Sequence, residues 1–158
     1  MTTTLLLDNS AWVRLADAAL PAERADGIAE ALESGRIAAC LPFLLEAGYS
    51  ARSAREHDQL LAELRSLPRY HLDDAVEQRA LEAQAQLARV GHHRLPPVDL
   101  LVAALADRHD LGVLHYDHDY DLIAEKTDLT FDSVWLAARG TLSRLEALTR
   151  SARMCPLS

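Results

Sequence analysis

Short apolar runs alternate with longer helical patterns along this chain of 158 residues, and this alternation constrains the fold more than any other feature. The runs cover residues 4–7, 36–40, 113–116 and 131–136, with a weaker candidate at 69–72. Strands that alternate with helices in this way form a parallel sheet whose two faces are covered by helices. We therefore expect an α/β fold with a central parallel sheet of four or five strands.

The segments between these runs place apolar residues at helical spacing. Pro21 and Pro42 suit the first turn of a helix, Gly35 and Gly112 suit positions just after a helix end, and Asp73 can cap a long helix. That long helix is expected to bury one side, on which Val76, Ala80, Leu81, Ala83, Leu87 and Ala88 lie. Helices are expected over residues 10–20, 21–35, 42 to about 67, 75–90, 98–109 and 122–126.

Length and composition fit one globular domain. Hydrophobic residues make up 49% and charged residues 25% of the chain, as in ordinary soluble proteins. We expect a domain over residues 1–138 and a C-terminal extension over 139–158, with room for one helix at 142–149. The longest apolar run, residues 100–106, is far shorter than the ~20 residues needed to cross a bilayer. With no secretory signal and only two cysteines, the expected location is the cytoplasm.

The net charge of −8 argues against sequence-blind coating of nucleic acid and draws attention to the acids. Asp8 follows the first strand, and Asp117 and Asp119 follow the fourth. Glu46 and Asp99 interrupt apolar segments in the first turns of two helices. Ligands of parallel sheets bind beyond the carboxyl ends of the strands, so we expect these acids to lie at one edge.

Carboxylates gathered in one pocket repel each other unless a cation or a proton joins them. A cluster of oxygen ligands suits Mg²⁺ or Mn²⁺, and such a centre can hydrolyse a phosphodiester. Taken singly, three of these acids also have a structural interpretation. Asp99 could favour a helix N-terminus, Asp119 could cap the next helix, and Glu46 could pair with Arg52.

Four segments together resemble the signature blocks of PIN domains, in particular the VapC-type toxins of type II toxin–antitoxin systems. They read LLLDNSAW at residues 5–12, PFLLE at 42–46, LPPVDLLVAA at 95–104 and HYDHDYDLIA at 115–124. The resemblance extends over residues 4–136. One departure is Tyr120, where phenylalanine is common, and the packing of the ring is expected to survive.

The resemblance implies a PIN-like fold and a Mg²⁺-dependent endoribonuclease, with Mn²⁺ able to substitute. It implies cleavage of RNA such as tRNA or rRNA, inhibition of translation, and a homodimer. It also implies a VapB-type antitoxin whose C-terminal segment enters the active groove, in a heterotetramer or a larger assembly. The implied metal ligands are Asp8, Glu46, Asp99 and Asp117, with Asp119 as a fifth catalytic acid and Ser10 as a hydrogen-bond support for Asp8.

Other interpretations are weaker. His115 and His118 could form a zinc or nickel site, although an exposed polar loop is the simpler reading. The absence of a glycine-rich turn after the first strand argues against a dinucleotide-binding domain. Arg14, closest to the expected groove, and Arg52 are candidate RNA contacts, while the arginines of residues 52–69 could equally be a solvated helix face. A non-catalytic interaction module and a nuclease acting on DNA remain the alternative functions.

Overall fold

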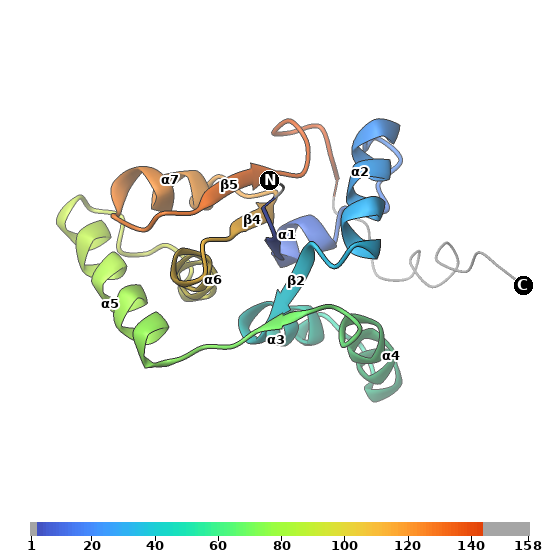
Figure 1. The fold of residues 1–158 in the computed structure, drawn as a ribbon, viewed down its shortest axis with the longest axis horizontal. Helices are drawn as coiled ribbons and strands as arrows, with labels where there is room; N and C mark the ends of the chain where they lie inside the picture. The colour runs from blue at the N-terminus through green and yellow to red at the C-terminus, as the bar shows by residue number, and fades with distance from the viewer. Residues whose placement is uncertain (1–2, 144–158) are drawn as a thin grey trace, which may run out of the picture.

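A five-stranded, all-parallel sheet forms the centre of the computed structural model, which describes residues 3–143 (Figure 1). The strand order is β3-β2-β1-β4-β5. The expected α/β fold with a parallel sheet is therefore confirmed. The strands are β1 (Leu5–Leu7), β2 (Ile37–Cys40), β3 (Arg69–Tyr70), β4 (Gly112–His115) and β5 (Asp132–Trp135).

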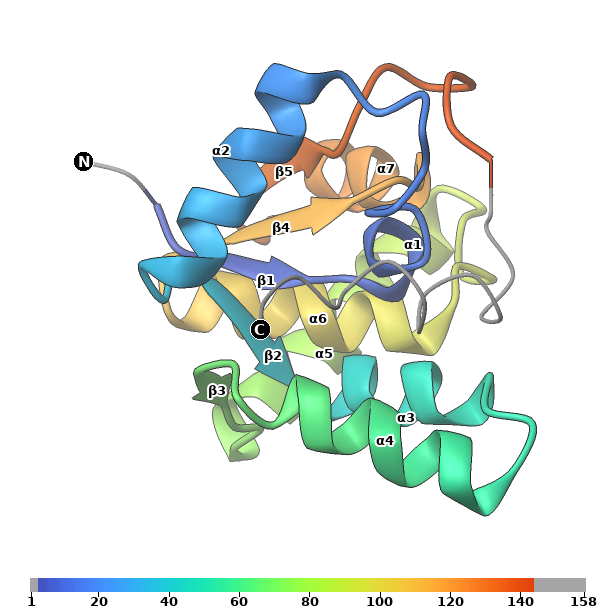
Figure 2. The same cartoon turned by 90° about the vertical axis from the view of Figure 1, so that its right-hand side faces the viewer.

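The central strand β1 pairs in parallel with β2 on one side and with β4 on the other. Leu5 aligns with Ile37 of β2 and with Gly112 of β4. The residues of β2 and β4 are buried throughout, and helices cover both faces of the sheet, which is why these strands read as continuous apolar runs. Figure 2 shows β1 and β4 running in the same direction toward α1, so their carboxyl ends meet at one edge.

Seven helices are described among residues 3–143. Figure 1 shows α6 and α7 on one side of the central strands and α1 and α2 on the other. The sheet is thus the middle of three layers. The helices are α1 (Asn9–Trp12), α2 (Ala22–Glu33), α3 (Leu41–Tyr49), α4 (Ala54–Leu64), α5 (Asp74–Arg89), α6 (Pro97–Arg108) and α7 (Asp119–Lys126).

The expected helix over residues 10–20 is wrong, because α1 ends at Trp12. The chain continues in turns, with the amide of Asp17 bonded to the carbonyl of Arg14. The Asp17 side chain then accepts a hydrogen bond from the amide of Ala19 at 2.8 Å. An aspartate that bonds its neighbouring backbone in this way competes with the helix.

Three smaller expectations also need correction. The helical stretch from residue 42 to 67 is two helices, and Ser53 caps the second by accepting from the amide of Glu56. Helix α7 begins at Asp119, before the expected residue 122. Leu81 and Ala88, expected on the buried side of α5, are exposed, Leu81 by 63%. Periodicity alone does not distinguish the edge of an apolar face from its centre.

The C-terminal end of the described chain packs back onto the domain. Leu142 is buried, and the amide of Ser143 donates to the carboxylate of Asp17. The helix expected at 142–149 falls mostly outside the described residues, and the boundary at residue 138 stays a prediction. No helix within residues 3–143 combines the length and the apolar character that a membrane span requires.

Close packing of the central strands at Gly112 gives a test of the fold. A Cβ at this position would lie 2.5 Å from a methyl group of Leu5 and 3.1 Å from the backbone oxygen of Asp132. We expect Gly112→Ala to lower the free energy of unfolding by about 1–3 kcal/mol in a denaturant titration. Gly27 of α2 has nothing within 4 Å of such a Cβ, so Gly27→Ala should be neutral or stabilising. Equal stability of both variants would contradict this packing.

Candidate metal centre

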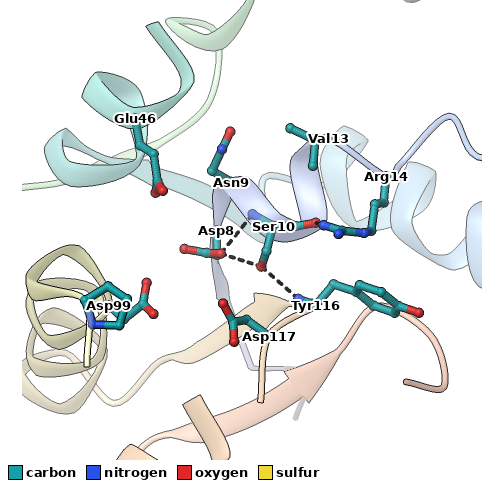
Figure 3. Close-up of a pocket in the computed structure, with 10 residues that line it drawn as sticks. Asp8, Asn9, Ser10, Val13, Arg14, Glu46, Asp99, Tyr116 and Asp117 are labelled. Atoms are coloured by element: carbon teal, nitrogen blue, oxygen red, sulfur yellow. Dashed lines mark hydrogen bonds between the residues drawn. The ribbon is translucent and has the colours of Figure 1, made fainter. Parts of the chain in front are cut away.

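Four carboxylates from separate parts of the chain line one cavity of about 230 Å³ at the carboxyl edge of the sheet (Figure 3). Asp8 follows β1 and Asp117 follows β4, while Glu46 lies on α3 and Asp99 in the first turn of α6. Asp8 is only 3% exposed and Asp99 only 6% exposed. The structure thus brings together the acids that the sequence singles out, and their role as metal ligands stays a prediction.

Asp8 is held by three hydrogen bonds. Its Oδ2 accepts from the amide of Ser10 at 2.9 Å and from the Ser10 hydroxyl at 2.5 Å. Its Oδ1 accepts from the hydroxyl of Tyr120 at 2.6 Å. The Ser10 hydroxyl in turn accepts from the amide of Tyr116, so it connects the ends of β1 and β4. Asp8 therefore presents its carboxylate in a fixed orientation.

Asp117 and Asp119 extend the acidic cluster toward α7. One carboxylate oxygen from each of Asp99, Asp117 and Asp119 lies within 4.8 Å of the others. The amide of Asp119 donates to Oδ1 of Asp117 at 3.0 Å, whereas no side chain caps α7 from its N-cap residue. The interpretation of Asp119 as the capping residue is therefore wrong, since Asp117 accepts the amide at this helix start.

Mutual repulsion and burial act most strongly on Asp99. Burial raises its pKa from an ordinary 3.8 to about 8, and the negative charges of Asp8, Asp117, Glu46 and Asp119 contribute in that order. The pKa of Asp119 is raised as well, by burial and then by Asp117. A site whose donors are all carboxylate oxygens and whose charges are unfavourable without compensation fits Mg²⁺ or Mn²⁺.

Arg14 lies at the rim of the cavity. Its Nη1 donates to the backbone oxygen of Ser10 at 2.7 Å, and its guanidinium is stacked 4.7 Å from the centre of the Tyr116 ring. Figure 3 shows this guanidinium beside Tyr116, on the side away from Asp99. Arg14 is the one basic residue among the described residues that line the cavity.

Arg52, by contrast, does not line the cavity. Its side chain is half-exposed and forms an ion pair with Glu56 at 3.3 Å, while the suggested pairing with Glu46 stays a prediction. Arg55, Arg65 and Arg69 are exposed. None of the arginines of residues 52–69 is therefore among the residues that line this cavity.

His115 is fully buried, and the expectation of an exposed loop is wrong for this residue. Its Nδ1 accepts from the amide of Asp117 at 3.1 Å, and its Nε2 lies 2.7 Å from the hydroxyl of Ser133. That hydroxyl donates to Asp121, so Nε2 carries the proton and the ring is neutral, in agreement with the lowered pKa that burial gives it. Both ring nitrogens are occupied, which excludes the zinc or nickel site with His118.

Two supporting residues were not found from the sequence. His115 accepts a hydrogen bond from the backbone amide of Asp117, and Tyr120 donates one to the carboxylate of Asp8. The ring of Tyr120 lies 4.8 Å from that of His115 and 6.5 Å from that of Phe131, so the expected ring packing is present. The hydroxyl of Tyr120, in a block where phenylalanine is common, was the one available signal.

Comparison with protein families gives a match to the PIN domain over residues 5–126. Among similar proteins, Ribonuclease VapC21 of Mycobacterium tuberculosis is 40% identical over 143 residues, which cover 89% of this chain and 99% of the relative. Ribonuclease VapC18 of the same organism is 38% identical over 139 residues, 86% of this chain and 97% of the relative. The similarity therefore extends over nearly the whole length of these proteins.

Solved structures show the same fold. The crystal structure of DNA-bound VapBC from Salmonella typhimurium aligns with a TM-score of 0.65 at 17% identity, over 86% of this chain and 100% of that chain. VapBC-5 from Mycobacterium tuberculosis aligns with a TM-score of 0.58 at 23% identity, over 84% and 100%. At this level of identity the likeness supports the architecture alone.

The raised pKa of Asp99 predicts how stability depends on pH without metal. The folded chain keeps this proton up to about pH 8, whereas the unfolded chain loses it near 3.8, so the free energy of unfolding falls as pH rises between these values. Asp99→Asn has no titrating carboxyl at this position and so removes this loss of stability. In EDTA at pH 7.5 its melting temperature should exceed that of wild type by at least about 2–4 °C, the shift that 1 kcal/mol gives at this size.

The difference in melting temperature between Asp99→Asn and wild type should shrink at pH 5, where wild-type Asp99 is protonated when folded. Asp26→Asn, on the exposed surface of α2, is the matched control and should follow wild type at both pH values. A melting temperature of Asp99→Asn at or below that of wild type at pH 7.5 would contradict the repulsion.

Proposed function

Because the chain belongs to the PIN domain family, we propose that it is a metal-dependent endoribonuclease toxin of the VapC type. It would cleave RNA, with tRNA or rRNA as the expected class, and so inhibit translation in the cytoplasm until an antitoxin binds. Relatives of nearly equal length at 40% and 38% identity are named ribonucleases. The observation that carries the proposal is the cavity in which Asp8, Glu46, Asp99 and Asp117 meet.

In this proposal Asp8 and Asp99 hold Mg²⁺ most directly, and Glu46, Asp117 and Asp119 complete the ligand set, directly or through water. A bound divalent cation supplies Lewis acidity that lowers the pKa of a water and offsets charge on the scissile phosphate. Asp99 gives up the proton of its carboxyl group as the cation binds. Ser10 and the backbone around Asp117 keep the ligands oriented, so little rearrangement is needed on binding.

The substrate reaches an acidic site on an acidic protein, so local basic groups have to offset repulsion of the phosphates. Arg14 at the rim of the cavity is the first candidate for this contact. Arg52 is a weaker candidate, because it is engaged with Glu56 outside the cavity. Single-stranded loops of RNA fit best, since their backbone and bases are accessible.

A VapB-type antitoxin is the proposed partner. A basic side chain from its C-terminal segment could enter the acidic cavity and take the place of the cation. An apolar cavity of about 220 Å³ between α2 and the turns after α1 offers a second contact, and it is lined by residues that include Trp12, Leu15, Leu20 and Ile28. The solved neighbours of this fold include complexes titled VapBC.

We also propose a homodimer, which the antitoxin would join in a heterotetramer or a larger assembly. Leu41, Leu45 and Tyr49 recur every four residues on α3 and are exposed by 44%, 64% and 92%. Residues four apart lie on the same face of a helix, so these three form an apolar stripe suited to a second copy. The catalytic domain in this proposal comprises residues 1–138, followed by an extension over 139–158.

Cleavage assays test the proposed activity. With Mg²⁺ present, wild type should cut RNA and leave single-stranded DNA of the same base sequence intact. Asp8→Asn and Asp99→Asn should each slow RNA cleavage by more than about 100-fold, since loss of even an outer-shell partner costs about 10–100-fold. Asp26→Asn, far from the cavity on α2, should cut RNA at the wild-type rate.

Three outcomes would contradict the assignment. If either active-site variant cuts RNA at the wild-type rate, the acids do not carry the chemistry. If wild type cuts DNA and spares RNA, the alternative of a DNA nuclease applies. If a folded wild type that binds Mn²⁺ cuts neither polymer, a non-catalytic PIN-like module is favoured.

A further inference from the structure

The hydroxyl of Tyr120, a residue distant from Asp8 in the sequence, donates a hydrogen bond to the Asp8 carboxylate. Tyr120 lies on α7, 112 positions along the chain from Asp8, and is fully buried. Its ring is packed between those of His115 and Phe131, which fixes the direction of its hydroxyl. Within residues 3–143, the other donors to the Asp8 carboxylate both belong to Ser10. Tyr120 is thus the side chain that ties Asp8 to α7.

The donors leave Asp8 little free capacity. An ionised carboxylate accepts about four hydrogen bonds, two on each oxygen. Oδ2 already accepts two, from the amide and the hydroxyl of Ser10. The Ser10 hydroxyl has a single proton and accepts from the amide of Tyr116, so its proton must point to Asp8. Oδ2 is therefore saturated.

The other carboxylate oxygen, Oδ1, accepts fewer hydrogen bonds than Oδ2. It accepts one hydrogen bond, from the Tyr120 hydroxyl at 2.6 Å, because an ionised carboxylate has no proton to donate in return. One lone pair remains on this oxygen. Figure 3 shows the Asp8 carboxylate directed into the space between Glu46 and Asp99, where this lone pair is available to a ligand of the cavity.

We propose that Tyr120 is a positioning residue, which leaves Asp8 one lone pair on Oδ1 and so makes it a ligand through a single oxygen. The inference rests on the proposed metal centre and specifies how one of its ligands binds. Coordination through one oxygen per carboxylate suits the octahedral geometry of Mg²⁺, whereas Ca²⁺ readily takes carboxylates through both oxygens. A phenylalanine at position 120 would keep the ring contacts and lose the orientation of Oδ1.

Binding of Mn²⁺ to Tyr120→Phe, measured by isothermal titration calorimetry, tests this role apart from catalysis. We expect a dissociation constant about tenfold higher than that of wild type, within the range for loss of an outer-shell partner. Tyr70→Phe removes the same atom from a ring that packs on His109, at the end of α6 opposite Asp99, and should stay within about twofold of wild type. Circular dichroism checks that each variant is folded.

A crystal structure of wild type with Mn²⁺ is a second test, and it needs no variant. It should show the cation on Oδ1 of Asp8 alone, with the Tyr120 hydroxyl still bonded to that oxygen. Coordination through Oδ2 or through both oxygens would overturn the proposal. So would a dissociation constant for Tyr120→Phe equal to or below that of wild type. If wild type itself takes up no Mn²⁺, the metal centre is wrong and this inference fails with it.

Discussion

Repulsion between buried carboxylates is the constraint on which this structure depends. The parallel order of β1 and β4 brings Asp8 and Asp117 to one edge of the sheet, and the start of α6 adds Asp99 to the same cavity. Such an arrangement costs folding free energy unless a proton or a cation compensates it. The raised pKa of Asp99 shows that a proton compensates part of the charge in the metal-free chain. A site that keeps such unfavourable charges at its centre is suited to bind a cation.

The groups around the acids hold them in place before any ligand arrives. Ser10 connects Asp8 to the amide of Tyr116, and His115 connects the amide of Asp117 to Ser133 of β5. Asp121 continues this chain by accepting from Ser133 and from the indole of Trp135. The first two connections join neighbouring strands, β1 to β4 and β4 to β5, and the third joins β5 to α7. The hydrogen bonds that order this edge of the sheet therefore also fix the orientation of the acids in the cavity.

The sequence predicted those features that depend on local pattern and on parallel-sheet topology. The apolar runs gave the strands, and the rule for the carboxyl ends of strands placed Asp8, Asp99 and Asp117 together. It did not predict that α1 ends at Trp12, or that the Asp17 side chain accepts from the amide of Ala19 in the turns that follow. Nor did it predict the buried, neutral ring of His115 or the bond from Tyr120 to Asp8. Those depend on partners from β5 and α7 that only the folded chain brings near, and no spacing in the sequence encodes them.

The central claim is that these distant acids share one hard cation. The most direct measurement is a calorimetric titration of Mn²⁺ into wild type and Asp8→Asn at pH 7, repeated in two buffers that differ in ionisation enthalpy. The account predicts saturable binding to wild type with release of up to one proton, because Asp99 is largely protonated beforehand, and greatly weakened binding to Asp8→Asn. Absence of uptake by wild type, or equal uptake by the variant, would contradict it.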